Sequence, residues 1–157
     1  MRLSISAALS VACLLFFTLA EADAQAMVHP PSAVQRSEIL AIAERHADKN
    51  GLPPTLVAAI ITVESSWFTS AKNGSSVGLM QITPGTARSL GFSGSLQDLF
   101  DPETNIRFGT LYLAEAYRLA DGDLCATVVR YQSGLGASSP NGANRAYCRK
   151  MKRLLTP

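Results

Sequence analysis

The sequence predicts a mainly α-helical protein. Apolar residues recur at helical spacing in most segments, and prolines or capping side chains stand where helices would begin. No alternating apolar and polar pattern, typical of a strand, extends beyond a few residues. The 157 residues suit one domain, and no internal repeat divides them.

The first two predicted helices lie in the N-terminal half. Residues 33–49 place their apolar side chains on one face, and Gly51 ends the pattern. The second helix begins at Pro53, where proline suits a first turn, and runs through an almost entirely apolar stretch to Glu64. Residues 69–77 are rich in serine, asparagine and glycine, which predicts a loop.

The later helices are marked by their first residues. Thr83 and Asp101 each precede a proline, so each is expected to cap a helix. Asp121-Gly122-Asp123 separates two apolar patterns, and a loop rich in glycine and serine starts at residue 133. The expected helices span residues 83–91, 101–120, 124–132 and 144–155.

Residues 1–24 are expected to form a secretory signal peptide. Arg2 supplies a basic start, residues 3–20 are apolar, and Ala22-Asp23-Ala24 fits a cleavage site. A transmembrane anchor is the alternative, although an apolar segment of this length is marginal for a bilayer, which needs about 20 residues. The fold is therefore expected within residues 25–157 of an exported chain.

Cys125 and Cys148 are the only cysteines after the expected signal peptide. Two cysteines in an exported protein most often form a disulfide. A catalytic thiol is the weaker alternative, because neither cysteine lies near His29 or His46 in the sequence. The cysteines and histidines show no metal-ligand spacing, so we expect no metal and no cofactor.

Residues 25–157 hold thirteen basic and ten acidic residues, and the basic ones gather near the C-terminus. An exported chain is a poor candidate for binding nucleic acid. An anionic envelope polymer, a membrane surface or a solvated helix face remain as interpretations. The cluster consists of Arg145, Arg149, Lys150, Lys152 and Arg153.

Glu64 is the strongest candidate for a catalytic residue. Val57, Ile60 and Ile61 lie seven, four and three positions before it, so Glu64 ends an apolar face of its helix. A carboxylate in such surroundings loses hydration, which favours the protonated acid. A carboxyl that is still protonated near neutral pH can act as a general acid.

The sequence offers no equally strong second carboxylate. Asp101 is better explained as a helix cap, and Asp98 and Glu103 as solvated charges near a helix start. Most glycosidases need two carboxylates beside the scissile bond. A single acid is enough when the substrate supplies its own nucleophile.

Five motifs resemble those of the catalytic domain of soluble-type lytic transglycosylases, in the same order and over about residues 36–155. They are Glu64-Ser65; Ser76–Gln81 with Pro84, Thr86 and Ala87; Asp101-Pro102 with Asn105-Ile106, Gly109 and Tyr112-Leu113; Tyr131–Gly134; and Tyr147. The resemblance implies a lysozyme-like helical domain of the goose-type superfamily. Gln132 departs from the pattern, because the family usually has asparagine there.

The resemblance also implies the reaction. Glu64 would protonate the glycosidic oxygen between N-acetylmuramic acid and the next N-acetylglucosamine. The C6 hydroxyl of the muramic acid would then attack C1 of the same ring and give its proton to the Glu64 carboxylate. The product would be a 1,6-anhydro sugar, formed without water or a cofactor.

The matching positions suggest substrate-binding residues. Ser65 would orient Glu64 or the N-acetyl group, unless it is simply a serine at a helix end. Gln81 would bind sugar hydroxyls or the N-acetyl group, and Met80 would form an apolar wall. Tyr131 would hydrogen-bond Glu64 or sugar, and Tyr147 would line the same groove.

The expected partner is a peptidoglycan glycan strand in the periplasm. A component of a secretion, pilus or flagellar machine is a further possible partner, because compact members of this family resemble the enzymes that open the wall for such machines. Two alternatives remain: a hydrolytic muramidase of the same fold, and a non-catalytic wall-binding scaffold.

Overall fold

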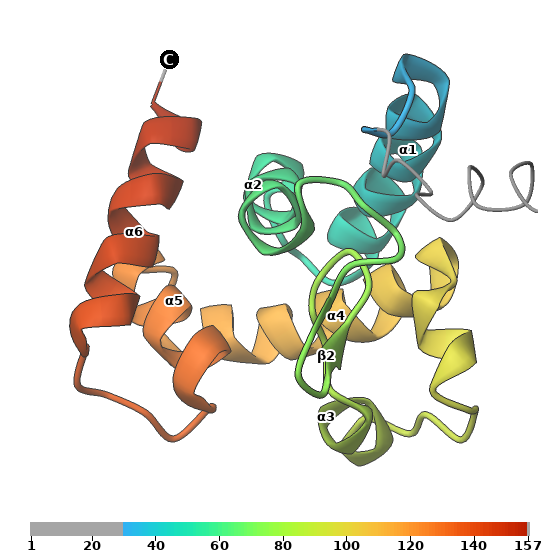
Figure 1. Cartoon of the computed structure of the whole chain (residues 1–157). Helices are drawn as coiled ribbons and strands as arrows, with labels where there is room; N and C mark the ends of the chain where they lie inside the picture. The colour runs from blue at the N-terminus through green and yellow to red at the C-terminus, as the bar shows by residue number, and fades with distance from the viewer. Residues whose placement is uncertain (1–29, 157) are drawn as a thin grey trace, which may run out of the picture.

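The computed structural model describes residues 30–156, so the predicted signal peptide lies outside the described residues. Within this range no helix is long and apolar enough to cross a bilayer. Six α-helices make up most of it (Figure 1). They are α1 (Ala33–Lys49), α2 (Pro54–Ser65), α3 (Pro84–Ser89), α4 (Pro102–Leu119), α5 (Leu124–Ser133) and α6 (Gly142–Leu155).

The helices begin where the sequence predicts them to begin. The side chains of Thr83 and Asp101 each accept a hydrogen bond from a backbone N–H of the first turn that follows. α6 starts two residues earlier than expected, because Asn141 and Asn144 cap each other's backbone N–H groups reciprocally. Local capping chemistry therefore fixes most helix boundaries.

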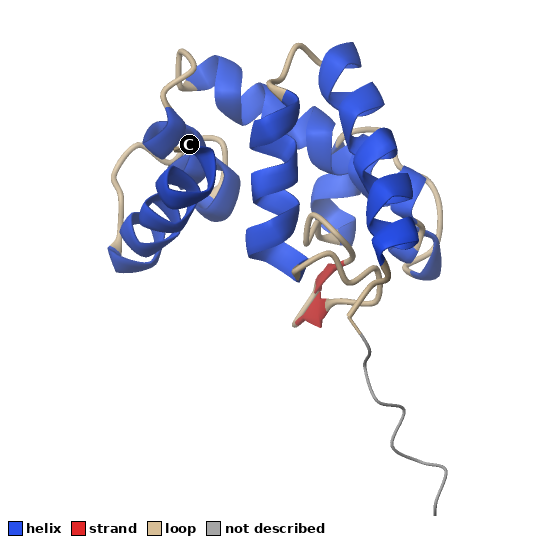
Figure 2. Cartoon of the chain, turned by 90° about the horizontal axis from the view of Figure 1, so that it is seen from above, coloured by secondary structure: helices blue, strands red, loops and turns tan. Residues whose placement is uncertain are grey.

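α4 runs through the middle of the molecule and contacts α1, α3 and α5 (Figure 1). α6 packs against α2 and α5, and α1 packs against α2. Seen from above, the helices lie around one another with a small two-stranded hairpin at one edge (Figure 2). This mainly helical arrangement agrees with the predicted fold class.

Two clusters of buried apolar residues meet at α4. The larger one joins side chains of α1, α2, α4, α5 and α6 with Leu79 and Met80. The smaller one joins Val77 and Ile82 to α3, α4 and the segment before α4. Residues 77–82 thus contribute to both clusters, and burial of apolar surface on both sides holds this segment in place.

Two short elements were not predicted. Strands β1 (Lys72–Asn73) and β2 (Ser76–Val77) form an antiparallel hairpin inside the expected loop. A 3₁₀ helix, η1 (Gln97–Phe100), precedes α4. Strands of two residues cannot show an alternating pattern, and one 3₁₀ turn shows no apolar periodicity.

Asn105, on α4, clamps the segment that follows the hairpin. Its side chain is completely buried. Its Oδ1 accepts a hydrogen bond from the Met80 backbone N–H at 2.8 Å, and its Nδ2 donates to the carbonyls of Val77 at 2.9 Å and Leu99 at 2.7 Å. One amide therefore satisfies two buried backbone groups, the Met80 N–H and the Leu99 carbonyl. It also adds a second hydrogen bond to the Val77 carbonyl, which accepts one from the Ile82 N–H as well.

Two glycines allow this close packing. Gly78 has a φ of 74°, and a Cβ there would lie 2.2 Å from Asn105 Nδ2. A Cβ on Gly109 would lie 2.5 Å from the Met80 sulfur. Close packing against Asn105 therefore explains Gly78, and close packing against the Met80 side chain explains Gly109.

An ionic contact ties α1 to the start of α4. Glu103 lies 2.7 Å from Nε2 of His46 and 2.6 Å from a guanidinium nitrogen of Arg45. The His46 hydrogen bond and the Arg45 charge lower the pKa of the Glu103 carboxyl. Glu103 is half-exposed in the first turn of α4, as expected of a solvated charge near a helix start, and the structure adds its pairing with Arg45 and the buried His46.

The predicted disulfide between Cys125 and Cys148 is present and joins α5 to α6, with a Cα–Cα distance of 5.3 Å. It encloses the loop of residues 134–141 between the two helices. Chain-entropy arguments give a bridge of this span a stabilising effect of about 3 kcal/mol. α5 and α6 are therefore held together covalently.

We predict that Asn105→Ala lowers the free energy of unfolding by about 3 kcal/mol, because it leaves the buried Met80 N–H and Leu99 carbonyl without partners. Urea denaturation followed by circular dichroism measures this loss. Asn73→Ala is the matched control, since Asn73 is exposed, and should change stability by less than about 0.5 kcal/mol. Equal small effects of both variants would contradict the clamp.

Candidate active site

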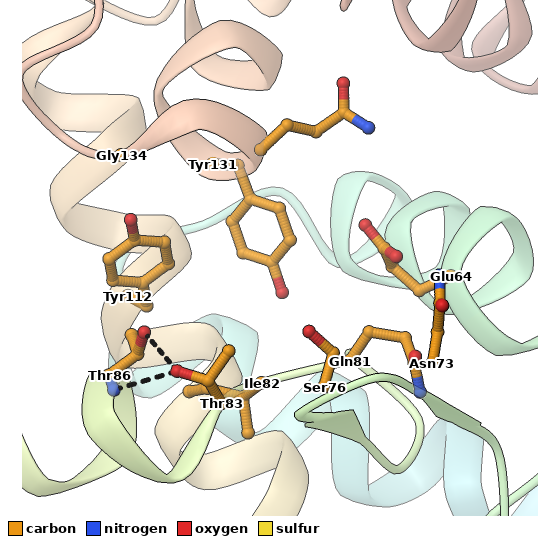
Figure 3. Close-up of a pocket in the computed structure, with 11 residues that line it drawn as sticks. Glu64, Asn73, Ser76, Gln81, Ile82, Thr83, Thr86, Tyr112, Tyr131 and Gly134 are labelled. Atoms are coloured by element: carbon orange, nitrogen blue, oxygen red, sulfur yellow. Dashed lines mark hydrogen bonds between the residues drawn. The ribbon is translucent and has the colours of Figure 1, made fainter. Parts of the chain in front are cut away.

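A pocket of about 480 Å³ opens beside Glu64 (Figure 3). Its volume lies in the range of about 300–1,000 Å³ that is usual for ligand sites. Its walls come from the end of α2, the hairpin, the start of α3, α4 and the end of α5. It is lined by Glu64, Asn73, Ser76, Gln81, Ile82, Thr83, Thr86, Tyr112, Tyr131, Gln132 and Gly134.

Glu64 reaches this pocket from the last turn of α2. Figure 3 shows its carboxyl group pointing into the space in front of Tyr131. Directly after the helix, Ser66 and Trp67 adopt left-handed φ values of 50° and 72°. Two such residues in succession turn the chain sharply away, which leaves the end of α2 open to the pocket.

Burial raises the pKa of the Glu64 carboxyl, in the direction that the sequence predicted. Two groups oppose this effect: the Tyr147 hydroxyl, which donates a hydrogen bond to Glu64 Oε1 at 2.8 Å, and the positive charge of Lys150. Both groups lie on α6. Glu64 therefore holds its proton more strongly than an exposed glutamate, and Tyr147 sets its orientation.

The structure shows which of the two tyrosines contacts Glu64, a contact that the sequence offered to Tyr131. Tyr147 is buried and bonds Glu64, whereas Tyr131 lines the pocket and donates its hydroxyl hydrogen to the Met80 carbonyl at 2.8 Å. Burial is the main cause that raises the pKa of both phenols, and the nearby charge of Glu64 raises it further. Both remain neutral hydrogen-bond donors at physiological pH.

Gln81 faces the pocket with a constrained amide. Its φ is 46°, a left-handed conformation that is uncommon for a residue other than glycine. Its Nε2 donates to the carbonyls of Ala71 at 3.1 Å and Gly78 at 2.8 Å. The donor side of the amide is thus occupied, and Oε1 is the part that can accept a hydrogen bond from a ligand.

Ser65 and Met80 lie away from the pocket. The Ser65 hydroxyl donates to the Ile61 carbonyl at 3.1 Å and accepts from the Trp67 N–H at 3.2 Å, so it closes the end of α2. The Met80 side chain is completely buried in the larger cluster. The structure places both where the more ordinary interpretations, a serine at a helix end and a core methionine, would place them.

Several polar groups that line the pocket were given no binding role from the sequence, although Ser76 and Thr86 belong to the quoted motif. Asn73 and Ser76 enter through the hairpin, which was not predicted. Thr83 and Thr86 share a hydrogen bond of 2.9 Å at the start of α3. The helix-cap pattern located these two threonines, but nothing in the sequence showed that the cap faces a cavity.

Gln132, which replaces the usual asparagine of the family motif, lines the pocket and is hydrogen-bonded to a residue that does not line it. Its Oε1 accepts a hydrogen bond from Asn144 Nδ2 at 3.0 Å. The same Nδ2 bonds the Ser133 hydroxyl. The longer glutamine side chain therefore reaches α6 and fixes the end of α5 against it.

Glu64 is the single charged residue among those that line the pocket. Asp98 bonds Ser95, and Asp101 caps α4 through the Thr104 N–H, which confirms the capping interpretation of Asp101. Among residues 30–156, no three histidine, cysteine or acidic side chains come close enough to hold a metal ion. Hydroxyls and amides surround one carboxyl, an arrangement suited to an uncharged polyhydroxylated ligand and to proton transfer by one acid.

The comparison with known families matches residues 41–152 to the transglycosylase SLT domain. This range contains every residue that lines the pocket. The match covers more than half of the chain, and it includes Tyr147 and both cysteines.

Curated proteins and solved structures give the same result. An endo-type membrane-bound lytic murein transglycosylase A from Cronobacter sakazakii is 36% identical over 125 residues, which are 69% of this chain and 62% of that protein. The soluble lytic murein transglycosylase of Escherichia coli is 36% identical over 102 residues, which are 59% of this chain but 16% of its own length.

Among solved structures, an inactive glutamate-to-glutamine mutant of the lytic transglycosylase Slt from Pseudomonas aeruginosa has a TM-score of 0.65 and 26% identity. The similarity covers 73% of this chain and 22% of that one. The chain therefore corresponds to part of each of these relatives. By its sequence and by its helical fold, it belongs to the transglycosylase SLT domain family.

Proposed function

We propose that this protein is a peptidoglycan lytic transglycosylase. It would cleave the β-1,4 bond between N-acetylmuramic acid and N-acetylglucosamine and leave 1,6-anhydro-muramic ends. The observation that carries the proposal is one carboxyl of raised pKa in a pocket otherwise lined by neutral groups. Such a site has an acid but no second carboxylate to activate water or to attack the sugar.

The reaction needs only one proton-transfer group. Glu64 gives its proton to the glycosidic oxygen, the C1–O bond breaks, and the glucosamine end leaves as an alcohol. The positive charge at C1 is shared with the ring oxygen and the N-acetyl carbonyl. The C6 hydroxyl then attacks C1 and returns a proton to Glu64, so the enzyme ends in its starting state.

The surrounding groups suit the two halves of this cycle. The Tyr147 hydroxyl bonds Glu64 Oε1 and stabilises the carboxylate that forms after the first proton transfer. Gln81 Oε1 is available to accept a hydrogen bond from a sugar hydroxyl or an acetamido N–H. Tyr131 fixes the Met80 carbonyl, and so holds the backbone beside Gln81 in place.

The relatives support this assignment. The named relatives are lytic murein transglycosylases, and the Pseudomonas neighbour is described as inactive after a glutamate is changed to glutamine. We also propose that residues 1–24 act as a signal peptide and that the enzyme works in the periplasm. A local role beside a secretion, pilus or flagellar assembly is compatible with the basic surface of α6.

We predict that the purified protein releases fragments with 1,6-anhydro-muramic ends from isolated sacculi, as measured by mass spectrometry. Glu64→Gln should lower the rate at least a hundredfold, because general acid catalysis contributes about 10²–10⁴-fold. Reducing muramic ends would instead identify a hydrolase. Binding to sacculi without release of fragments by the unaltered protein would identify a scaffold.

The same variant should be at least as stable as the unaltered protein. Glu64 has a raised pKa, so its ionised form costs stability above the ordinary glutamate pKa, and this cost disappears as the pH falls below that value. Glutamine carries no charge to desolvate. Thermal melts at pH 7 should give an equal or higher Tm for Glu64→Gln, and a lower Tm would show that its inactivity comes from unfolding.

We predict that Tyr147→Phe moves the alkaline limb of the pH–rate profile to higher pH. Activity falls as the pH rises through the Glu64 pKa, since the acid must start protonated. Loss of a hydrogen bond to the carboxylate raises that pKa further, by roughly one pH unit. Tyr117→Phe, a partly buried tyrosine absent from the pocket lining, is the control, and an unshifted limb in Tyr147→Phe would contradict the assigned contact.

A further inference from the structure

A second hollow of about 240 Å³ lies between α5 and α6, separate from the Glu64 pocket. The two sites share no lining residue. On α5, Val129 lines the hollow and Tyr131 lines the pocket. Side chains two positions apart on a helix point about 200° away from each other, so these two residues face nearly opposite sides of α5. The two sites adjoin where Asn144 of the hollow donates a hydrogen bond to Gln132 of the pocket at 3.0 Å.

The rim of the hollow is basic. Arg145, Arg149 and Lys152 line it from α6, at spacings of four and three residues that place them on one side of the helix. All three are exposed, and none of the three ion pairs found within residues 30–156 involves α6. Asp123 is the last acidic residue of the chain, and its side chain caps α5, so the rim's positive charge has no acidic residue from α5 or α6 to balance it.

The floor of the hollow is largely apolar and rigid. The disulfide between Cys125 and Cys148 forms part of it, with Val129 and Pro140 beside the bridge. The one buried polar side chain there, Asn144, is already bonded to Gln132 and Ser133. A ligand that fits would place an apolar group on this floor and negative charges against the rim.

A membrane surface is a poor match for this site. A basic amphipathic helix binds a bilayer by inserting its apolar face. Most of the apolar side chains of α6 are already buried: Tyr147 and Cys148 are almost fully covered, and Met151 is completely covered. Leu154, in the last turn, is 48% exposed. The apolar surface beside the rim is concave, which suits a side chain of a peptide better than a flat layer of lipid headgroups.

We propose that the hollow between α5 and α6 is a docking site for an acidic peptide segment of a partner protein, with an apolar side chain seated on the disulfide and acidic side chains paired with Arg145, Arg149 and Lys152. The charge complementarity argues for this occupant, since no other part of the described chain supplies carboxylates to this rim. The site adds a partner to the proposed function and does not depend on the reaction at Glu64.

The test uses a synthetic peptide in which a central leucine is flanked on both sides by aspartate and glutamate, with binding measured by fluorescence anisotropy. Arg149→Glu combined with Lys152→Glu should weaken binding at least tenfold, because two ion pairs become two repulsions. Lys49→Glu combined with Arg88→Glu makes the same change in net charge at exposed positions outside the hollow. This control should bind within about twofold of the unaltered protein, as expected for distant, screened charges.

Three further measurements complete the test. Replacing the central leucine by glycine should also weaken binding, because the apolar floor then has no partner. Glu64→Gln should bind the peptide as tightly as the unaltered chain, and the rim variant should digest sacculi at the normal rate. These measurements therefore test the docking site and the proposed activity separately, and a negative result for one leaves the other standing.

Three results would overturn the proposal. Equal loss of peptide binding in the rim variant and the control would show a response to net charge alone. Competition by soluble muropeptides would assign the hollow to the peptide stems of the substrate. Rim-dependent binding to phosphatidylglycerol vesicles without binding to the peptide would assign it to a lipid surface.

Discussion

The buried amide of Asn105 is the constraint on which the pocket depends. Its three hydrogen bonds to Met80, Val77 and Leu99 fix the segment between the hairpin and α3 against α4. The Met80 peptide is held at both ends, since Asn105 bonds its N–H and Tyr131 bonds its carbonyl. Asn105 of α4 and Tyr131 of α5 thus position Gln81, the residue after Met80, although Gln81 lies in neither helix.

The acid is shaped by a balance of opposing effects. Burial at the end of α2 raises the pKa of Glu64, while Tyr147 and Lys150 from α6 lower it. The same α6 is tied to α5 by the disulfide and by the bonds of Asn144. The pKa of Glu64 is therefore raised by burial at the end of its own helix and adjusted by contacts with a helix that is distant in the sequence.

Much of the fold could be predicted because its signals are local. Proline and capping side chains mark the helix starts, and apolar periodicity marks the helix faces, so the helix boundaries agreed with expectation to within about two residues. The raised pKa of Glu64 followed from three apolar neighbours on its own helix. The hairpin and η1 were not predicted, because they are too short to show a periodic pattern of apolar residues.

The partners of the site residues could not be predicted in the same way. Tyr131 and Tyr147 are chemically equivalent in the sequence, and only the packing of α5 and α6 decides which one bonds Glu64. Met80 and Gln81 are adjacent, yet one is completely buried and the other lines the pocket. The two tyrosines are distinguished by contacts between distant residues, with a separation of 51 for Tyr131 and Met80 and of 83 for Tyr147 and Glu64.

The left-handed backbone at Gln81, like that at Ser66 and Trp67, has a consequence for efforts to make this protein more resistant to heat. Glycine would relax the backbone at Gln81, and an uncharged residue at the end of α2 would remove the desolvation of Glu64. Trp67 differs, because its side chain is buried in the core and its loss would cost stability. A selection for thermal resistance alone would therefore favour replacing the residues that give the pocket its chemistry. The native sequence keeps this local strain, and the remainder of the fold supplies the surplus stability that tolerates it.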